Sequence, residues 1–234
     1  MVKRLPLICQ QIIGSLGTRQ CYICDQESNE LVCDYCLHDT DFAHFPVPGM
    51  DLLELEFISK RLLSINYNNL RAIAYHHGIL ASLINQLKFS QKPLVADILG
   101  TFFETYVLHR LSQLEALPEA LMPMPISSWR FMQRQYNQSW LLAKAINRYH
   151  KIPIIQPVIR HRHTKQQSRL SREQRLANTN DAFSLREPIK VQHIGIVEDV
   201  ITTGASMYNL CECIRSHTPD IKISVWCMAV TKVE

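Results

Sequence analysis

The sequence predicts an α/β protein, with a mostly parallel sheet and flanking helices, preceded by a small cysteine-rich domain. Over 70–234, short runs rich in β-branched residues alternate with longer stretches of helical periodicity, which is typical of strands joined by crossover helices. Over 18–40, four cysteines stand in two closely spaced pairs. We therefore divide the chain into an N-terminal helix and cysteine-rich segment at 1–45, a connector at 46–69 and an α/β domain at 70–234.

The individual elements follow from apolar periodicity and from turn residues. Apolar residues at helical spacing predict helices over 79–89, 94–113, 137–149 and 206–217. Shorter apolar runs predict an edge strand at 71–75, a short strand at 121–124, a central strand at 191–197 and a last strand at 221–230. The connector is expected to contain a short helix within 51–63. Two prolines in 151–157 favour a loop or a short extended piece there.

The four N-terminal cysteines form a CxxC-x8-CxxC pattern. Paired knuckles of this kind place four sulfur atoms in a tetrahedron, which suits Zn²⁺ held by thiolates. A disulfide framework is the alternative, but the start of the chain shows no clear cleavage site and four further cysteines lie elsewhere. Four protein ligands leave no open position on the metal. A structural zinc site is therefore predicted at Cys21, Cys24, Cys33 and Cys36.

Charge is spread unevenly along the chain, although the net formal charge is only +4. Residues 1–60 carry four Lys/Arg and nine Asp/Glu, whereas 130–175 carries eleven Lys/Arg and a single acid, Glu173. So positive a segment predicts a phosphate-bearing partner, and an ordinary solvated surface is the alternative. No apolar run reaches the roughly 18 residues of a membrane-spanning helix. We therefore expect a cytoplasmic protein without a membrane span.

The most informative segment is 194–206. It begins with an apolar run that is typical of a buried strand. Glu198 and Asp199 are expected where that strand ends, which is the usual ligand position of an open α/β sheet. A loop follows that can wrap backbone N–H groups and hydroxyls around a phosphate, and a simple helix cap is the alternative. Two acids beside a phosphate loop suit a ribose 5-phosphate. The loop residues are Thr202, Thr203, Gly204, Ala205 and Ser206.

These thirteen residues resemble the phosphoribosyl-pyrophosphate (PRPP) signature of type I phosphoribosyltransferases. More narrowly, the chain resembles the ComF family, phosphoribosyltransferase-like proteins associated with bacterial DNA uptake and competence. Segments 86–89, 134–139 and 162–175 carry this narrower resemblance, together with the paired CxxC. The resemblance implies a type I phosphoribosyltransferase-like sheet. It also implies that Glu198 and Asp199 are catalytic, accepting hydrogen bonds from the ribose hydroxyls and stabilising positive charge on the ring.

The resemblance also implies positions for the pyrophosphate group and for Mg²⁺. One pyrophosphate loop follows the first core strand, which points to Ser127, with Arg130 and Arg134 just after it. In the family a flexible loop folds over the bound ligand. That loop maps to 160–175, where Arg162 and Lys165 are candidate ligand contacts. Mg²⁺ fits as a hydrated ion shared by hydroxyls and pyrophosphate, because it keeps waters and needs few carboxylates.

Three functions remain open at this point. The first is transfer of the phosphoribosyl group of PRPP to an acceptor that the sequence does not identify. The second is binding of single-stranded DNA through the basic segment. The third is sensing of PRPP without turnover. DNA-uptake proteins are further expected partners. Lys88 belongs to one of the ComF-like segments, but an ordinary surface lysine on an amphipathic helix fits its position equally well.

Overall fold

A computed structural model describes residues 20–38, 49–90, 92–161 and 182–231 of the chain. The chain divides into two compact units, Met1–Ala43 and His44–Glu234. The boundaries at residues 45 and 69 stay a prediction. The expected N-terminal helix, and the candidate contacts Arg162 and Lys165, lie outside the described residues. Within the described ranges, no helix combines the length and the apolar character needed to cross a membrane.

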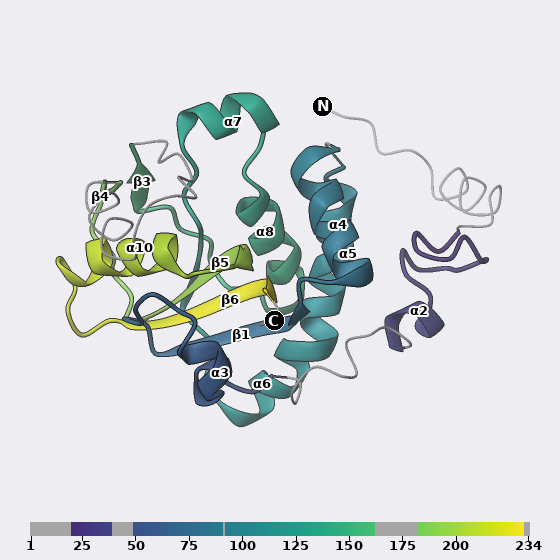
Figure 1. Ribbon diagram of the computed structural model, residues 1–234, viewed down its shortest axis with the longest axis horizontal. Helices are drawn as coiled ribbons and strands as arrows, with labels where there is room; N and C mark the ends of the chain where they lie inside the picture. Colours follow the sequence, from purple (N-terminus) through teal and green to yellow (C-terminus); the bar gives the residue numbers. More distant parts are fainter. Residues whose placement is uncertain (1–19, 39–48, 91, 162–181, 232–234) are drawn as a thin grey trace, which may run out of the picture. The chain divides into compact units, whose positions relative to one another are not determined.

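The second unit is built on a four-stranded sheet in the order β1-β6-β5-β2, in which every pair is parallel (Figure 1). Every residue of β2, and all but the first residue of β6, is buried, as expected for parallel strands covered on both faces. The predicted parallel sheet is therefore confirmed, and β1 lies at its edge as predicted. The strands are β1 Asn69–Tyr75, β2 Ala120–Pro123, β5 His193–Ile201 and β6 Lys222–Val230.

Helices flank this sheet, and the longer ones lie where apolar periodicity predicts them (Figure 1). Asn137 caps the start of α8, because its side chain accepts a hydrogen bond from the backbone N–H of Ser139 at 3.0 Å. Helices α4 and α8 both pack against α5, and α8 also contacts β2 and β5. The bounds are α4 Gly78–Phe89, α5 Leu94–Phe103, α8 Gln138–His150 and α10 Ala205–Arg215.

The helix predicted over 94–113 contains an irregular turn. A π-helical turn, η3 Glu104–Leu108, joins α5 to α6 His109–Leu114. The packing of α5 on α8 is close at Gly100, where an added Cβ would lie only 2.6 Å from the Cβ of Ala145. A residue without a side chain therefore allows these two helices to approach each other.

Several short elements complete the second unit. The helix expected within 51–63 is present as a 3₁₀ turn, η2 Leu52–Glu54, followed by α3 Glu56–Ser59. Strands β3 Val158–Arg160 and β4 Phe183–Leu185 pair antiparallel as a separate two-stranded sheet. The sequence does not predict this pairing, because each strand has only three residues. The seven-residue helix α7 Ser128–Arg134 precedes α8.

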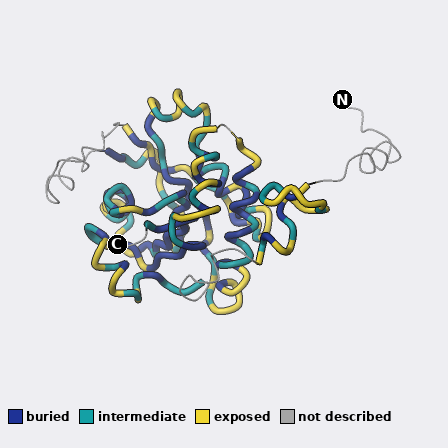
Figure 2. Tube along the Cα trace, turned by 45° about the vertical axis from the view of Figure 1, so that its right-hand side comes forward, coloured by how far each residue is buried: buried dark blue, intermediate teal, exposed yellow. Residues whose placement is uncertain are grey.

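The core of this unit lies around the central strands, where buried residues appear in dark blue in Figure 2. Trp226 of β6 is fully buried, and its ring centroid lies 5.6 Å from that of Phe103 in α5. The exposed residues, in yellow, lie mostly on outer helices and turns. The central strands therefore form a buried base from which loops at the carboxyl edge project.

The chain leaves β2 and β5 in opposite directions across the sheet. From β2 it passes through α8 to Ile154, which forms an isolated parallel bridge with Leu121 on the side of β2 away from β5. From β5 it passes through α10 to β6. Neighbouring strands whose connections diverge form a switch point, and open α/β sheets bind ligands outside the carboxyl ends of such strands. The topology thus places a candidate site beyond Pro123 and Val197.

Candidate functional site

The two signature acids lie within β5 rather than after it. A strand ending at residue 197 was predicted, but β5 continues to Ile201, so the expectation that the acids follow the strand is wrong. β2 stops at Pro123, the partner of Val197, whereas β6 continues to pair with β5 as far as Ile201. The longer partner keeps β5 extended. Glu198 and Asp199 therefore occupy the part of β5 that projects past β2, at the switch point.

Asp199 is held in an ion pair with Lys88. The Oδ1 atom of Asp199 lies 3.1 Å from the Nζ atom of Lys88, and the two side chains are 10% and 20% exposed. Lys88 stands in the last turn of α4, where the helix dipole favours a cation. Its position on an amphipathic helix does not distinguish it from a surface lysine. The signal that could have found it is its place in the ComF-like segment 86–89.

Glu198 is the second acid of the site, and its environment raises the pKa of its carboxyl group. Its Oε1 atom accepts hydrogen bonds from the Ser139 hydroxyl and from the backbone N–H of Asp199, both at 3.0 Å. Burial, followed by the negative charge of Asp199, raises the pKa of Glu198 to about 7, while the hydrogen bonds and Lys88 oppose this rise. Ser139 lies in the first turn of α8 and was not predicted as a site residue, although it ends the ComF-like segment 134–139.

Arg134 approaches the acids from α7. Its guanidinium group lies 5.5 Å from the centre of the Phe89 ring and donates a hydrogen bond to the Oε1 atom of Gln138 at 3.0 Å. Burial lowers the pKa of Arg134, whereas the negative charges of Asp199 and Glu198 raise it. The charges of both acids therefore act on Arg134, which was predicted as a site residue.

Ser127 and Arg130 lie at the start of α7, just beyond the carboxyl end of β2. The buried hydroxyl of Ser127 caps α7 by accepting a hydrogen bond from the backbone N–H of Arg130 at 3.4 Å. The charge of Arg130 acts on Arg134 and on Arg160 of β3, lowering the pKa of each after the larger effect of burial. The negative charge of Glu198 also reaches Arg160. The charges of the three arginines thus act on one another and on the acids, and Arg160 was not among the predicted site residues.

The Thr/Gly loop joins β5 to α10 at the same edge. Gly204 takes a left-handed conformation, with φ of +73°, as the N-cap of α10. The connector supports the loop, because the backbone N–H of Leu63 donates to the carbonyl oxygen of Thr203 at 3.0 Å. In the described structure, Gly204 provides no side-chain cap and the first turn of α10 contains no acid. The N–H groups of that turn therefore retain a positive potential that suits an anion.

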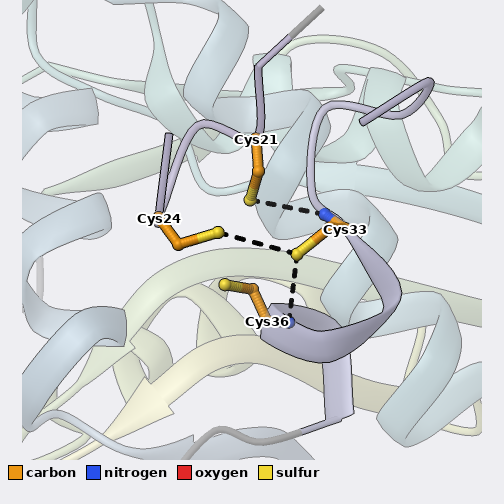
Figure 3. Close-up of side chains that lie close together, drawn as sticks. All are labelled: Cys21, Cys24, Cys33 and Cys36. Carbon is orange, nitrogen blue, oxygen red and sulfur yellow. Dashed lines mark hydrogen bonds between the residues drawn. The ribbon is translucent and has the colours of Figure 1, made fainter. Parts of the chain in front are cut away.

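The first unit contains a second candidate site, the cysteine cluster of Cys21, Cys24, Cys33 and Cys36 (Figure 3). All four sulfur atoms lie within 4.8 Å of one another, and those of Cys24 and Cys33 are 3.7 Å apart. A tetrahedral zinc site with Zn–S bonds of about 2.3 Å has sulfur atoms about 3.8 Å apart. The predicted ligands are therefore brought together, and their donor set fits a metal ion such as zinc.

Hydrogen bonds within the cysteine cluster also suit thiolates. The backbone N–H of Cys33 points to the Sγ atom of Cys21, and that of Cys36 to the Sγ atom of Cys33, both at 3.4 Å. Burial raises the pKa of Cys21, but backbone N–H donors from Cys33, Cys24 and Ile23 outweigh it and lower the pKa to about 6. Burial and then the neighbouring thiols raise the pKa of Cys36. Without a cation, the four thiols cannot all ionise at low cost.

Comparison with known proteins yields clear relatives, although no family model matches the chain. The DNA utilization protein YhgH of Escherichia coli K12 is 32% identical over 168 residues, which cover 70% of this chain and 73% of that protein. Competence protein F of Haemophilus influenzae is 29% identical over 170 residues, with the same coverage of both chains. YhgH of Salmonella typhimurium is 30% identical over 155 residues, covering 65% and 67%. The chain therefore belongs to the ComF family, as its motifs predict.

Proposed function

We propose that this protein binds PRPP at the carboxyl edge of its sheet and acts in DNA uptake or DNA utilization. The observation that carries the proposal is the meeting of two acids, Glu198 and Asp199, with two cations, Lys88 and Arg134, at the switch point. Acids suit the hydroxyls of a sugar, and cations suit phosphates. A sugar that carries both a vicinal diol and phosphate groups satisfies the whole set.

In this proposal each part of PRPP has a place. The ribose hydroxyls donate hydrogen bonds to Glu198 and Asp199. The 5′-phosphate lies in the loop at 202–206, against the N-terminus of α10, where Gly204 permits close approach of the backbone. The pyrophosphate group lies toward α7, with Arg130 and Arg134 as its partners. Ser127 orients the start of α7. Arg162 and Lys165, in the segment 160–175 that maps to the family's flexible loop, are further candidate contacts of the ligand.

The same arrangement supports phosphoribosyl transfer on a type I phosphoribosyltransferase-like fold. In that reaction the bond from C1′ to pyrophosphate breaks, a nucleophile bonds to C1′ and loses a proton, and pyrophosphate leaves. Glu198 and Asp199 would stabilise the positive charge that develops on the ring, and the arginines would stabilise the departing anion. Mg²⁺, bound with PRPP, would neutralise part of the pyrophosphate charge.

The biological role is proposed from the family. The names of the relatives refer to competence and to DNA utilization. A ligand that is a precursor of nucleotides is consistent with a protein that handles incoming DNA. We further propose that the cysteine cluster holds a structural Zn²⁺, because its four sulfurs provide a complete tetrahedral ligand set.

Calorimetric titration of PRPP with Mg²⁺ into the wild type and Asp199→Asn tests the proposed site. The variant keeps the size of the side chain but loses its charge, so we expect an affinity loss of about tenfold to a hundredfold. Asp220→Asn, at an exposed position, is the matched control and should bind normally. Absence of binding to the wild type, or equal binding to Asp199→Asn, would contradict the proposal. Pyrophosphate release in the presence of candidate acceptors then separates a transferase from a PRPP sensor.

A second candidate function is binding of single-stranded DNA, and one observation favours it. Helix α7, described over its full length, buries none of its side chains. It exposes Trp129 just before Arg130, and Phe131 and Met132 between Arg130 and Arg134. Phe89 is 71% exposed and lies beneath Arg134. Aromatic rings interleaved with arginines are typical of surfaces on which unpaired bases stack.

Fluorescence anisotropy with a labelled oligonucleotide tests this surface. Phe131→Ser should weaken binding about tenfold at constant salt dependence, because it removes one stacking platform. Arg130→Gln should instead reduce the slope of log affinity against log salt by about 0.7, because one phosphate contact is lost. Binding that is insensitive to salt and to both changes would exclude this surface as the DNA site.

A further inference from the structure

We propose that Lys88 binds the pyrophosphate group of the ligand, and that its ion pair with Asp199 is the ligand-free arrangement of the site. This inference rests on the proposed function and assigns a role to a residue of α4. The ion pair joins side chains that are 111 positions apart in the chain, so it is a product of the fold.

The position of the ion pair would allow Lys88 to leave Asp199 and bind a phosphate group of the ligand. A shielded ion pair contributes little net stability, because desolvation of both groups offsets their attraction. Lys88 nevertheless keeps 20% of its side chain exposed at the carboxyl edge, so its ammonium group remains within reach of a ligand. A lysine side chain is flexible, with rotatable donors that can move from a carboxylate to a phosphate.

The backbone that carries Lys88 is held beside the turn that carries Arg134. The hydroxyl of Tyr136, between α7 and α8, donates to the carbonyl oxygen of Leu87. The next residue after Lys88 is Phe89, whose ring lies under the guanidinium group of Arg134. Lys88 and Arg134 are thus mounted on adjoining elements, and the charge of Asp199 acts on both. Two cations at linked positions suit an anion with two phosphate groups.

If Lys88 and Asp199 each exchange the other for a part of the ligand, the site would select ribose esters that carry a pyrophosphate group. Ribose hydroxyls that donate to Asp199 displace Lys88, and a pyrophosphate group in the same molecule receives the released ammonium group. Every charged group then keeps a partner. Ribose 5-phosphate has the hydroxyls but lacks the pyrophosphate, so it must leave Lys88 unpaired or bind without displacing it, and either outcome costs affinity. Lys88 would therefore discriminate diphosphate esters of ribose from the monophosphate.

Calorimetry with three ligands tests this role: PRPP with Mg²⁺, inorganic pyrophosphate with Mg²⁺, and ribose 5-phosphate. Lys88→Met should weaken the binding of PRPP and of pyrophosphate by about tenfold or more, and its affinity for ribose 5-phosphate should equal or exceed that of the wild type. Lys88→Arg should restore most of the affinity for PRPP, because it keeps a phosphate donor. Lys144→Met, at an exposed position of α8, is the matched control and should resemble the wild type for all three ligands. Thermal melting checks the fold of each variant.

The affinity losses of Lys88→Met for the three ligands, compared with one another, distinguish a binding role of Lys88 from a structural one. An equal loss for all three ligands in Lys88→Met would show a structural role and overturn the inference. Unchanged binding of pyrophosphate would overturn it too, while PRPP binding by the wild type would leave the proposed function standing. A wild type that binds none of the three ligands would overturn both proposals. If Lys88→Met does not fold, Lys88→Gln, which keeps a hydrogen-bond donor for Asp199, carries the same test with the same expected ratio.

Discussion

The cysteine cluster and the acid-bearing edge of the sheet both gather groups of like charge, but they neutralise that charge differently. Residues 20–38 hold four acids besides the four cysteines and contain no lysine or arginine. At the sheet edge, Glu198 and Asp199 have Lys88, Arg134 and the Ser139 hydroxyl around them. The second site therefore carries its own counterions, whereas residues 20–38 offer the first site no lysine or arginine, so the metal that we propose there would supply its positive charge.

This difference separates folding from binding. A short segment whose thiolates lack protein cations folds only as its metal binds, so metal and structure are lost together. The sheet edge is assembled by a buried core and by ion pairs within the chain, so it is formed before any ligand arrives. We expect the first unit to respond to chelators and the second to respond to mutations in its packing.

The largest effect is expected from Cys24→Ser, which removes one sulfur from the cluster. The variant should lose its bound zinc and the folded structure of 20–38, because metal binding in such sites contributes on the order of 10 kcal/mol. Metal analysis and NMR of the first unit measure this loss, and Cys213→Ser, outside the cluster, is the control. The unfolding midpoint of the second unit should not change. A Cys24→Ser protein that retains zinc would refute the four-thiolate site.

Gly100→Ala tests the opposite case, in which packing fails while metal is retained. The new Cβ would lie 2.6 Å from the Cβ of Ala145 and would push α5 away from α8. Overpacking costs about 3 kcal/mol, and the better helix propensity of alanine returns about 1 kcal/mol, so we expect a net loss of about 2 kcal/mol. Urea unfolding followed by tryptophan fluorescence measures it. Unchanged stability would show that the helices separate at no cost.

Glu198→Gln tests whether ionisation of Glu198 lowers the free energy of unfolding. Because the pKa of Glu198 is raised from 4.5 to about 7, the folded protein keeps a proton that the unfolded chain releases between these values. Its contribution to the free energy of unfolding therefore decreases as pH rises through this window and stays low above pH 7.

The Gln variant removes this titration, so it should exceed the wild type in stability by about 1–2 kcal/mol at pH 8 and by much less at pH 4.5. Urea unfolding at the two pH values gives the comparison, and the exposed Glu187→Gln serves as control. A difference that does not change with pH would mean that Glu198 titrates normally.

The smallest effect is expected from Gly204→Ala, in the loop that joins β5 to α10. Alanine at a φ of +73° costs about 1 kcal/mol, and its Cβ would lie 3.0 Å from the Cδ2 atom of Leu62. Gly204→Asn should recover part of this loss, because asparagine tolerates the left-handed region. Thermal melting and PRPP titration measure both variants. Equal melting temperatures for wild type and Gly204→Ala would show that the loop adapts without strain.

The sequence predicted the cysteine cluster more completely than the sheet edge, for a physical reason. Two CxxC pairs lie within 16 residues, so their spacing alone brings the sulfurs together. The parallel sheet and its long helices were also predictable, because burial gives each helix an apolar period and gives strands covered on both faces a continuous apolar run. The PRPP-like loop could be found because its residues are consecutive.

What could not be predicted depends on contacts between distant segments. The length of β5 is set by β6, which pairs with β5 beyond the residue that faces the end of β2. The position of the acids within a strand could therefore be known only from the tertiary structure. The ion pair of Lys88 with Asp199 and the hydrogen bond of Ser139 to Glu198 join residues from separate elements. Periodicity could place Lys88 and Ser139 on helices but could not identify them as partners of the acids.

Helix α7 has one further consequence, which concerns local stability. A helix that buries none of its seven side chains is held mainly at its ends, by the Ser127 cap and by the turn at Tyr136. Its amides should exchange with solvent at a lower opening free energy than those of the buried helix α8. A ligand that engages Arg130 and Arg134 would then order this helix, and part of the binding energy would appear as slower hydrogen exchange. The element that bears the arginines would thereby report occupancy of the site through its dynamics.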